Sequence, residues 1–302
     1  MKQFGKLYTL LFTLALTAFC AYALMDTFVI TRVYASAEQK ENVQTNTAAA
    51  EPRTLSREIA ESSPTAYRDE NMSITLSTYY ENDTSIYVAD IQVSSPELLK
   101  AALSRNSYGK NVTAETSDTA SSVHALLAIN GDNYGSREKG YVIRNGVLYR
   151  DKASRGQEDL VIYSDGSFDL INETDVSAQE LLQNGAVQVF SFGPGLIEDG
   201  AVIVDTDDEV DRAKASNPRT AIGILGENHY VFVVSDGRSS ESEGLTLHEL
   251  ACFMQGLGVQ CAYNLDGGGS STMVFRDEVI NNPTSGHRSG ERAVTDIVYI
   301  GY

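Results

Sequence analysis

The segment Asn264–Thr272 combines a carboxylate, three glycines and three hydroxyl groups within nine residues. It follows an apolar run, so Asp266 is expected at the end of a strand. Three consecutive glycines cost backbone entropy that an ordinary turn rarely requires, and they let N–H groups converge on an anion. The segment therefore predicts a carboxylate beside an anion cradle, with a β-bulge and a solvated aspartate as the alternative. The predicted cradle consists of Gly267, Gly268, Gly269, Ser270 and Ser271.

A second polar segment ends the apolar run VHALLAIN. Asn130, Gly131 and Asp132 stand at the mouth of the expected loop, where the two polar side chains could position sugar hydroxyls. Tyr134 offers a ring that could stack on a sugar face. The alternative is a simple Asn-Gly turn.

Two arginines stand at the ends of other expected strands. Arg219 and Thr220 begin one strand, and a guanidinium in that position can clamp a phosphate through two parallel hydrogen bonds. Asp236 and Arg238 follow another strand and offer a second carboxylate and a second phosphate ligand. The alternatives are a surface arginine and an ordinary Asp-Gly turn.

A helix over Thr246–Leu257 is predicted from apolar residues at helical spacing. Thr246 and Glu249 form a capping box at its start, and Gly258 suits its C-terminal end. Glu249 is also a candidate catalytic acid, and the two roles are compatible.

The strands that must position these residues follow from apolar runs and turn residues. Hairpins over 141–150 and 160–171 are expected to turn at Asn145-Gly146 and Asp165-Gly166, both suited to a type I′ turn. Pro96–Leu103 is expected to be a short helix. The fold class that follows is α+β, a single domain on a mixed, strand-rich twisted sheet with a few flanking helices. Further strands are expected at Met72–Tyr80, Thr84–Val93, Val123–Asn130, Ala186–Phe192, Leu196–Val204, Ala221–Leu225, Tyr230–Ser235, Val259–Leu265, Ser271–Phe275 and Val294–Ile300.

The N-terminus predicts export. The run Leu7–Met25 carries no charge and follows Lys2 and Lys6, so residues 1–30 are expected to anchor the chain in the cell membrane with the rest outside the cytoplasm. Secretion after cleavage of a signal segment is the alternative, because small-x-small sites occur at 21–23 and 35–37. Residues 31–66 are predicted to be a flexible polar linker, and 67–302 the folded domain.

Charge and cysteine content exclude several classes of partner and site. The 302-residue chain has 23 basic and 41 acidic residues, a net charge of −18, which disfavours nucleic acid as a partner and requires a local basic pocket for any anionic substrate. Cys252 and Cys261 could form one disulfide, but two buried free thiols are favoured. No Cys/His spacing suggests zinc, and His124 is expected in the core.

Five motifs in this order resemble the phosphodiester glycosidase family, which includes a mammalian N-acetylglucosaminidase and bacterial proteins of exopolysaccharide biosynthesis. They are N-P-R-T-A-I-G at Asn217–Gly223, S-D-G-R at Ser235–Arg238, T-L-H-E-L at Thr246–Leu250, N-L-D-G-G-G-S-S-T-M-V at Asn264–Val274 and E-R-A-V-T-D at Glu291–Asp296. A-I-N-G at Ala128–Gly131 precedes them. The resemblance covers Ser121–Tyr302 well and Tyr67–Ala120 loosely.

The resemblance implies hydrolysis of a sugar-1-phosphodiester at the anomeric C–O bond, in a phosphorylated glycan of the cell envelope or an exopolysaccharide. It implies Asp266 as base or nucleophile, and Asp236 or Glu249 as the second carboxylate. A metal-dependent phosphodiesterase with a divalent cation, and a non-catalytic envelope protein that binds glycans, are the alternatives. No cofactor is otherwise indicated.

Overall fold

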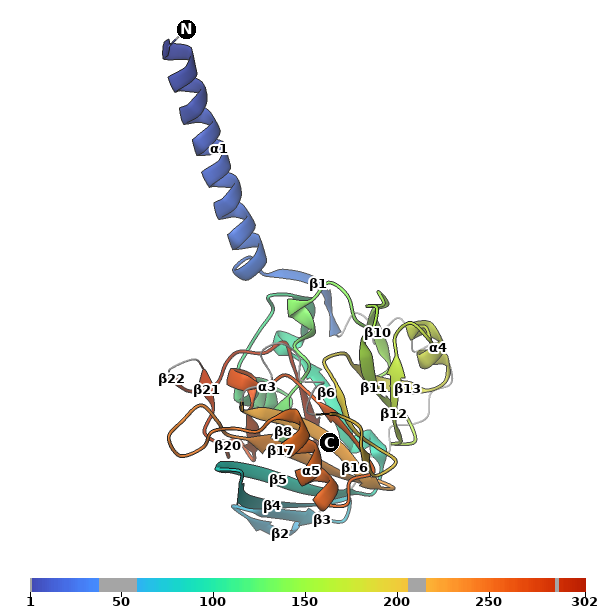
Figure 1. Cartoon of the computed structure of the whole chain (residues 1–302). Coiled ribbons are helices and arrows are strands. Elements are labelled where there is room, and N and C mark those ends of the chain that lie inside the picture. The colour runs from blue at the N-terminus through green and yellow to red at the C-terminus, as the bar shows by residue number, and fades with distance from the viewer. Residues whose placement is uncertain (1, 38–58, 206–215, 286–287) are drawn as a thin grey trace.

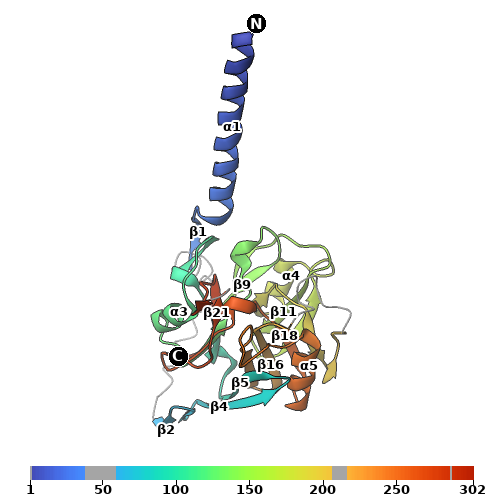
Figure 2. The same ribbon diagram turned by 60° about the vertical axis from the view of Figure 1, so that its left-hand side comes forward.

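The computed structural model describes the chain except residues 1, 38–58, 206–215 and 286–287. Helix α1 (Lys2–Phe28) stands clear of a strand-rich domain in two views (Figures 1 and 2). Its stretch Tyr8–Phe28 has a mean hydropathy of 1.8 and no burial against the domain. Among the described residues it is the one helix long and apolar enough to cross a membrane.

The domain is built on three larger sheets. The nine-stranded sheet has the order β15-β14-β18-β16-β17-β5-β4-β3-β2. Its strands are β2 (Ile59–Ser63), β3 (Ala66–Asp69), β4 (Met72–Glu81), β5 (Thr84–Val93), β14 (Gly195–Glu198), β15 (Ala201–Val202), β16 (Arg219–Gly226), β17 (His229–Ser235) and β18 (Cys261–Asn264). The antiparallel pairings of β4 with β5 and of β16 with β17 are among the longest in this sheet.

Two five-stranded sheets complete it. The β8 sheet contains β20 (Glu278–Val279), β19 (Met273–Phe275), β8 (Leu127–Asn130), β23 (Asp296–Ile300) and β6 (Leu99–Leu103) in that order. The β11 sheet contains β10 (Val147–Arg150), β9 (Val142–Arg144), β13 (Ala186–Phe190), β11 (Glu158–Tyr163) and β12 (Phe168–Asn172). Two small pairs are β1 (Arg32–Ser36) with β7 (Ser107–Lys110), and β21 (Thr284–Ser285) with β22 (Arg288–Ser289).

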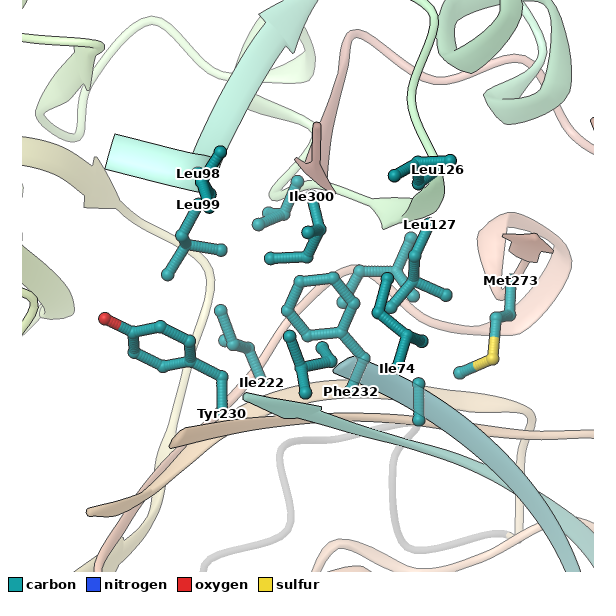
Figure 3. Packing of buried hydrophobic residues seen from close by; sticks show 14 of the residues in the cluster. Ile74, Leu98, Leu99, Leu126, Leu127, Ile222, Tyr230, Phe232, Met273 and Ile300 are labelled. Atoms are coloured by element: carbon teal, nitrogen blue, oxygen red, sulfur yellow. The ribbon is translucent and has the colours of Figure 1, made fainter. Parts of the chain in front are cut away.

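The main core lies between the nine-stranded sheet and the β8 sheet (Figure 3). Ile222 and Phe232 from the first sheet meet Leu127 and Ile300 from the second, and all four side chains are fully buried. Burial of large apolar side chains on this scale is the main term that stabilises the domain. The remaining elements are short: α3 (Thr116–Ser122), α4 (Ala178–Gln183), α5 (Leu247–Gly256), η1 (Pro96–Leu98), η2 (Ser104–Asn106), η3 (Tyr134–Ser136) and η4 (Gly268–Ser270).

The α+β, strand-rich class with few helices is confirmed. The strands, however, divide among several sheets, and every strand pairing within the described part of the chain is antiparallel rather than mixed. Helix α5 is confirmed with its capping box, and Gly258 follows it with φ +88°. The Asn145-Gly146 turn has positive φ at both residues, as a type I′ turn requires.

Several local predictions were wrong. Only Pro96–Leu98 is helical in the predicted helix, because Leu99–Leu103 pairs with β23 and alternates in burial. The predicted strand Leu196–Val204 is instead the β14–β15 hairpin, which turns at Asp199-Gly200 with positive φ at both residues. Gly166 has positive φ but Asp165 does not, so that hairpin lacks a type I′ turn. His124 is an exposed turn residue, not a core residue.

The ends of the predicted linker 31–66 are paired with the domain. Strand β1 pairs with β7, and β2 pairs with β3. Asp26, near the end of α1, forms ion pairs with Arg32 and Lys110, and the Asn111 amide donates to the Ile30 carbonyl at 3.0 Å. The middle of the predicted linker, 38–58, lies outside the described residues.

The cysteines are free thiols. The prediction of free Cys252 and Cys261 is therefore confirmed, but Cys252 is exposed and Cys261 is only half-buried. Burial raises the pKa of Cys261 to about 12, which keeps that thiol protonated and unreactive at neutral pH.

Candidate active site

A cavity of about 680 Å³ opens where strand ends of the nine-stranded sheet meet loops of the β11 sheet. β16 begins, and β17 and β18 end, at this edge, because Arg219 pairs with Ser235 and Ala221 pairs with Asn264. Of the predicted site residues, the cavity is lined by Arg219, Arg238, Asp266, Gly267 and Gly268. The other predicted residues lie outside it: Asn130, Gly131, Asp132, Thr220, Asp236, Glu249, Gly269, Ser270 and Ser271.

Asp266 presents an oriented carboxylate to this cavity. Its Oδ2 accepts a hydrogen bond from the Ser270 hydroxyl at 2.6 Å and an ion-paired hydrogen bond from Arg292 Nη2 at 2.9 Å. Arg292 also donates from Nε to the Ser270 hydroxyl at 2.9 Å, which closes a three-residue network. Within the described chain Oδ1 accepts no hydrogen bond, so one carboxylate oxygen is left for a ligand.

The glycine segment turns tightly beside Asp266. A Cβ on Gly267 would lie 2.9 Å from the Pro218 carbonyl oxygen, and Gly268 has φ +63°. The N–H groups of Gly268, Ser270 and Ser271 donate to the carbonyls of Pro218, Gly267 and Gly268. Three amides of the predicted cradle are therefore already occupied, and the glycines serve close packing and turn geometry.

Asn130 and Thr220 hold the Asp266 strand end in place. Asn130 Nδ2 donates to the Asp266 carbonyl at 2.6 Å, and its Oδ1 accepts from the Thr220 hydroxyl at 2.8 Å and the Thr272 N–H at 3.2 Å. Both side chains are fully buried. The structure thus gives Asn130 a positioning role rather than contact with sugar hydroxyls.

Three arginines, Arg219, Arg238 and Arg292, surround the glycine segment; we call them the strand-end arginines. Arg219 is almost fully buried, and its Nε donates to the Leu245 carbonyl at 2.7 Å. Arg238 donates to Asn217 Oδ1 from Nε and Nη2. These anchors fix the guanidinium groups at the cavity before any anion binds, which favours electrostatic stabilisation. Sequence reasoning missed Arg292, although it lies in the E-R-A-V-T-D motif.

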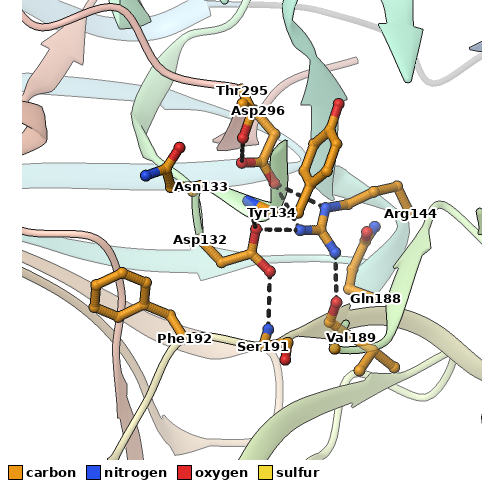
Figure 4. Close-up of polar contacts among 12 residues, drawn as sticks. Asp132, Asn133, Tyr134, Arg144, Gln188, Val189, Ser191, Phe192, Thr295 and Asp296 are labelled. Carbon is orange, nitrogen blue, oxygen red and sulfur yellow. Dashed lines mark hydrogen bonds and ion pairs between the residues drawn. The ribbon is translucent and has the colours of Figure 1, made fainter. Parts of the chain in front are cut away.

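Asp132 belongs to a buried ion network (Figure 4). Arg144 Nη2 contacts Asp132 Oδ1 at 2.8 Å and Asp296 Oδ2 at 2.7 Å, and the three side chains are at most 2 % exposed. The Ser191 N–H donates to Asp132 Oδ2 at 2.8 Å. Burial raises the pKa of Asp296 to about 7, although Arg144 opposes that shift. The network joins β8, β9, β13 and β23, so Asp132 is committed to structure.

Gly131 and Tyr134 are also structural. A Cβ on Gly131 would lie 2.4 Å from Asp296 Oδ1, so only glycine fits against that carboxylate. Tyr134 is buried and stacks on Tyr108 with ring centroids 5.2 Å apart. Its ring is therefore unavailable for a sugar.

Both oxygens of Asp236 and one oxygen of Glu249 accept hydrogen bonds outside the cavity. Asp236 accepts from Tyr87, from Asn281, and from both the backbone and the amide of Asn282. Burial and then the Asp236 charge raise the pKa of Tyr87 to about 12, so the phenol remains a donor. Glu249 Oε2 accepts from the N–H and the hydroxyl of Thr246, both at 2.8 Å.

A second wall of the cavity comes from the β11 sheet and the loop before β9. Arg137 Nη1 donates to the Ser191 carbonyl at 2.8 Å, and its guanidinium lies 5.0 Å from the Phe192 ring centroid. Tyr263 accepts from the Phe192 N–H and donates to the Glu158 carbonyl, which fixes two wall segments. Sequence reasoning missed this wall because its residues follow no recognisable motif.

Metal-ligating side chains do not gather in this cavity. Among the described residues, no three His, Cys, Asp or Glu side chains are placed to hold a metal ion. The cavity instead offers two carboxylates, Asp266 and Glu158, together with several guanidinium groups. This set suits an anionic substrate and chemistry at a carbon centre next to it.

Comparison with known proteins points to one family. The model of the phosphodiester glycosidase family matches residues 124–301. The chain is 32 % identical over 183 residues to the SPbeta prophage-derived uncharacterized protein YomE of Bacillus subtilis (strain 168), covering 59 % of this chain and 28 % of that protein. It is 28 % identical over 188 residues to N-acetylglucosamine-1-phosphodiester alpha-N-acetylglucosaminidase of Mus musculus, covering 57 % and 36 %.

A solved structure shares the fold. It is the zebrafish N-acetylglucosamine-1-phosphodiester alpha-N-acetylglucosaminidase catalytic domain, auto-inhibited by its pro-peptide, with a TM-score of 0.60 and 21 % identity. The match covers 82 % of this chain and 89 % of that one. The chain spans about a third of the length of the curated relatives it matches.

Proposed function

The chain belongs to the phosphodiester glycosidase family, and from that premise we propose that it hydrolyses sugar-1-phosphodiester linkages at the anomeric C–O bond. The proposed substrates are phosphorylated glycans of the cell envelope or exopolysaccharides. The observation that carries the proposal is the Asp266 carboxylate beside three anchored arginines: it is held through Oδ2, and no donor among the described residues reaches Oδ1.

The mechanism follows from the positive charge of the strand-end arginines and the negative charge of Asp266. The strand-end arginines hold the phosphodiester and stabilise the phosphate monoester as it leaves. A phosphate monoester is a better leaving group than a sugar hydroxyl, so the reaction needs less acid assistance than ordinary glycoside hydrolysis. Asp266 acts at the anomeric carbon as nucleophile or as base for water, and Ser270 and Arg292 hold its orientation.

The membrane location is part of the proposal. Helix α1 anchors the chain, and the domain lies on the extracytoplasmic side, as Lys2 and Lys6 before the apolar run favour.

Hydrolysis in H₂¹⁸O tests the proposal. The full chain in detergent is incubated with the methyl phosphodiester of α-N-acetylglucosamine 1-phosphate. Cleavage of the anomeric C–O bond yields unlabelled methyl phosphate, and Asp266→Asn is expected to lower kcat by about 10²–10⁴-fold, the usual range for a lost acid–base or nucleophilic group.

Each other outcome points to a different function. Label in the phosphate would show P–O cleavage and favour a phosphodiesterase. Binding without turnover in the wild type would favour a glycan-binding protein. The anomer released first, followed by NMR, reports whether configuration is retained or inverted.

A further inference from the structure

The cavity carries more positive charge than one phosphodiester requires. Five basic side chains line it against two acidic ones, a surplus of three positive charges in a chain of net charge −18. A phosphodiester carries a single negative charge. Clustered like charges are costly unless an anionic ligand neutralises them, so the surplus indicates a ligand with more than one anionic group.

The five basic residues come from two different parts of the fold. The strand-end arginines surround Asp266 on the side of the nine-stranded sheet. Arg137 and Lys139, here called the loop bases, precede β9 and belong to the side of the β11 sheet. A ligand that binds both groups must contact both parts of the cavity lining.

Arg137 is held in place through one of its nitrogens, and its other N–H groups can donate to a ligand. Only its Nη1 is engaged, with the Ser191 carbonyl and with Gln157 Oε1 at 3.3 Å, and the Phe192 ring supports the guanidinium plane. Nε and Nη2 make no hydrogen bond within the described residues. Lys139 is exposed and forms no ion pair with any described residue. The loop bases are thus a second anion site, in which Arg137 is preorganised and Lys139 adds positive charge.

We propose, on the basis of the function above, that the substrate is a glycan in which sugar-phosphodiester units repeat. The strand-end arginines bind the phosphodiester that is cleaved, and the loop bases bind the phosphate of the neighbouring unit. The cavity volume of about 680 Å³ lies within the range of ~300–1,000 Å³ of sites that enclose drug-sized ligands, so it has room beyond the scissile bond.

Two substrates that differ by one phosphate test this assignment. Both are N-acetylglucosamine 1-phosphodiesters, one of glycerol and one of glycerol 3-phosphate, offered to the full chain in detergent. We expect the wild type to show kcat/KM about tenfold higher for the second substrate, since a charge-assisted contact is worth roughly that factor. Arg137→Gln and Lys139→Gln are each expected to bring the ratio of the two kcat/KM values towards one.

Arg155→Gln is the matched control, because it removes the same charge from an exposed position that does not line the cavity. It is expected to leave the ratio at the wild-type value. Equal kcat/KM for both substrates in the wild type would overturn the inference. So would equal losses on both substrates in the two loop-base variants, since a structural role leaves the ratio unchanged. Turnover of neither substrate would instead remove the proposed function, and this inference with it.

Discussion

Asp266 and Asp236 show how two aspartates at neighbouring strand ends acquire different roles. Asp236 spends both oxygens on four hydrogen bonds that hold Tyr87 and the 281–282 segment. Asp266 lines the cavity, and only its Oδ2 accepts hydrogen bonds from residues that the structure describes. A catalytic carboxylate needs the arrangement of Asp266, because a carboxylate whose lone pairs all accept hydrogen bonds has none left for water or an anomeric carbon.

We therefore expect Asp236→Asn to act on stability. An amide nitrogen would face donors that now meet a carboxylate oxygen, and leaving them unsatisfied costs about 1–3 kcal/mol of unfolding free energy. Urea unfolding measures this loss. The kcat per folded molecule should stay within about twofold of wild type, and a loss of kcat as large as that of Asp266→Asn would return Asp236 to the mechanism.

The sequence indicated Asp266, Arg219 and Arg238 because glycines, proline and charges cluster around them at strand ends. The sequence could not show that these three residues line the cavity whereas Asn130 and Asp132 do not, because Asn130 and Asp132 are also polar residues at a strand end. That distinction depends on which side chain meets a buried partner across the sheets, and such partners lie more than 80 residues away in sequence for Asn130.

At the scale of elements, local signals succeeded where one segment determines its own structure. The capping box of α5 and the Asn145-Gly146 turn need only residues within a few positions. Leu99–Leu103 failed because its pairing partner β23 lies almost 200 residues later, and that pairing outweighs local helix preference. The division into three sheets has the same non-local origin.

Glu249 provides a test at this scale. Glu249→Gln keeps an acceptor for Thr246 and is expected to retain both stability and kcat within about twofold. Glu249→Ala removes the reciprocal cap and should cost about 0.5–2 kcal/mol, measured by thermal unfolding. A large loss of kcat in Glu249→Gln with an intact fold would contradict the purely structural role.

Arg144 joins elements that the sequence separates. It bridges Asp132 and Asp296 between the β8 and β11 sheets and lies 4.2 Å from the Phe190 ring centroid. Arg144→Met leaves two buried carboxylates without a counter-charge, so the unfolding free energy should fall by about 3–5 kcal/mol. Arg155→Met, on the exposed surface, should change it by less than about 0.5 kcal/mol. Similar effects of the two variants would contradict the network's role.

At the scale of the whole molecule, Asp159 makes stability depend on pH. It is fully buried in the β11 sheet, and burial followed by the Glu173 charge raises its pKa to about 10. The unfolded carboxyl ionises near pH 4, so between about pH 4 and 10 the folded state binds the extra proton. This contribution to stability is present at low pH and is lost as pH rises.

Asp159→Asn mimics the protonated carboxyl and removes this dependence. The unfolding free energy of the variant relative to wild type should increase with pH, by up to about 1.4 kcal/mol per pH unit between pH 5 and 9. Urea unfolding at several pH values measures the difference. A difference that does not change with pH would show that Asp159 ionises alike in both states.

The close joint between α1 and β1 would also set how the proposed enzyme reaches a glycan at a membrane. Only Val29, Ile30 and Thr31 separate the helix from a strand paired with β7, and three extended residues span about 10 Å. With α1 in a bilayer, this short connection would hold the domain close to the lipid surface at a nearly constant distance. Its search for substrate would then be two-dimensional, and its turnover would follow the number of glycan chains per unit area of membrane rather than their concentration in the surrounding fluid.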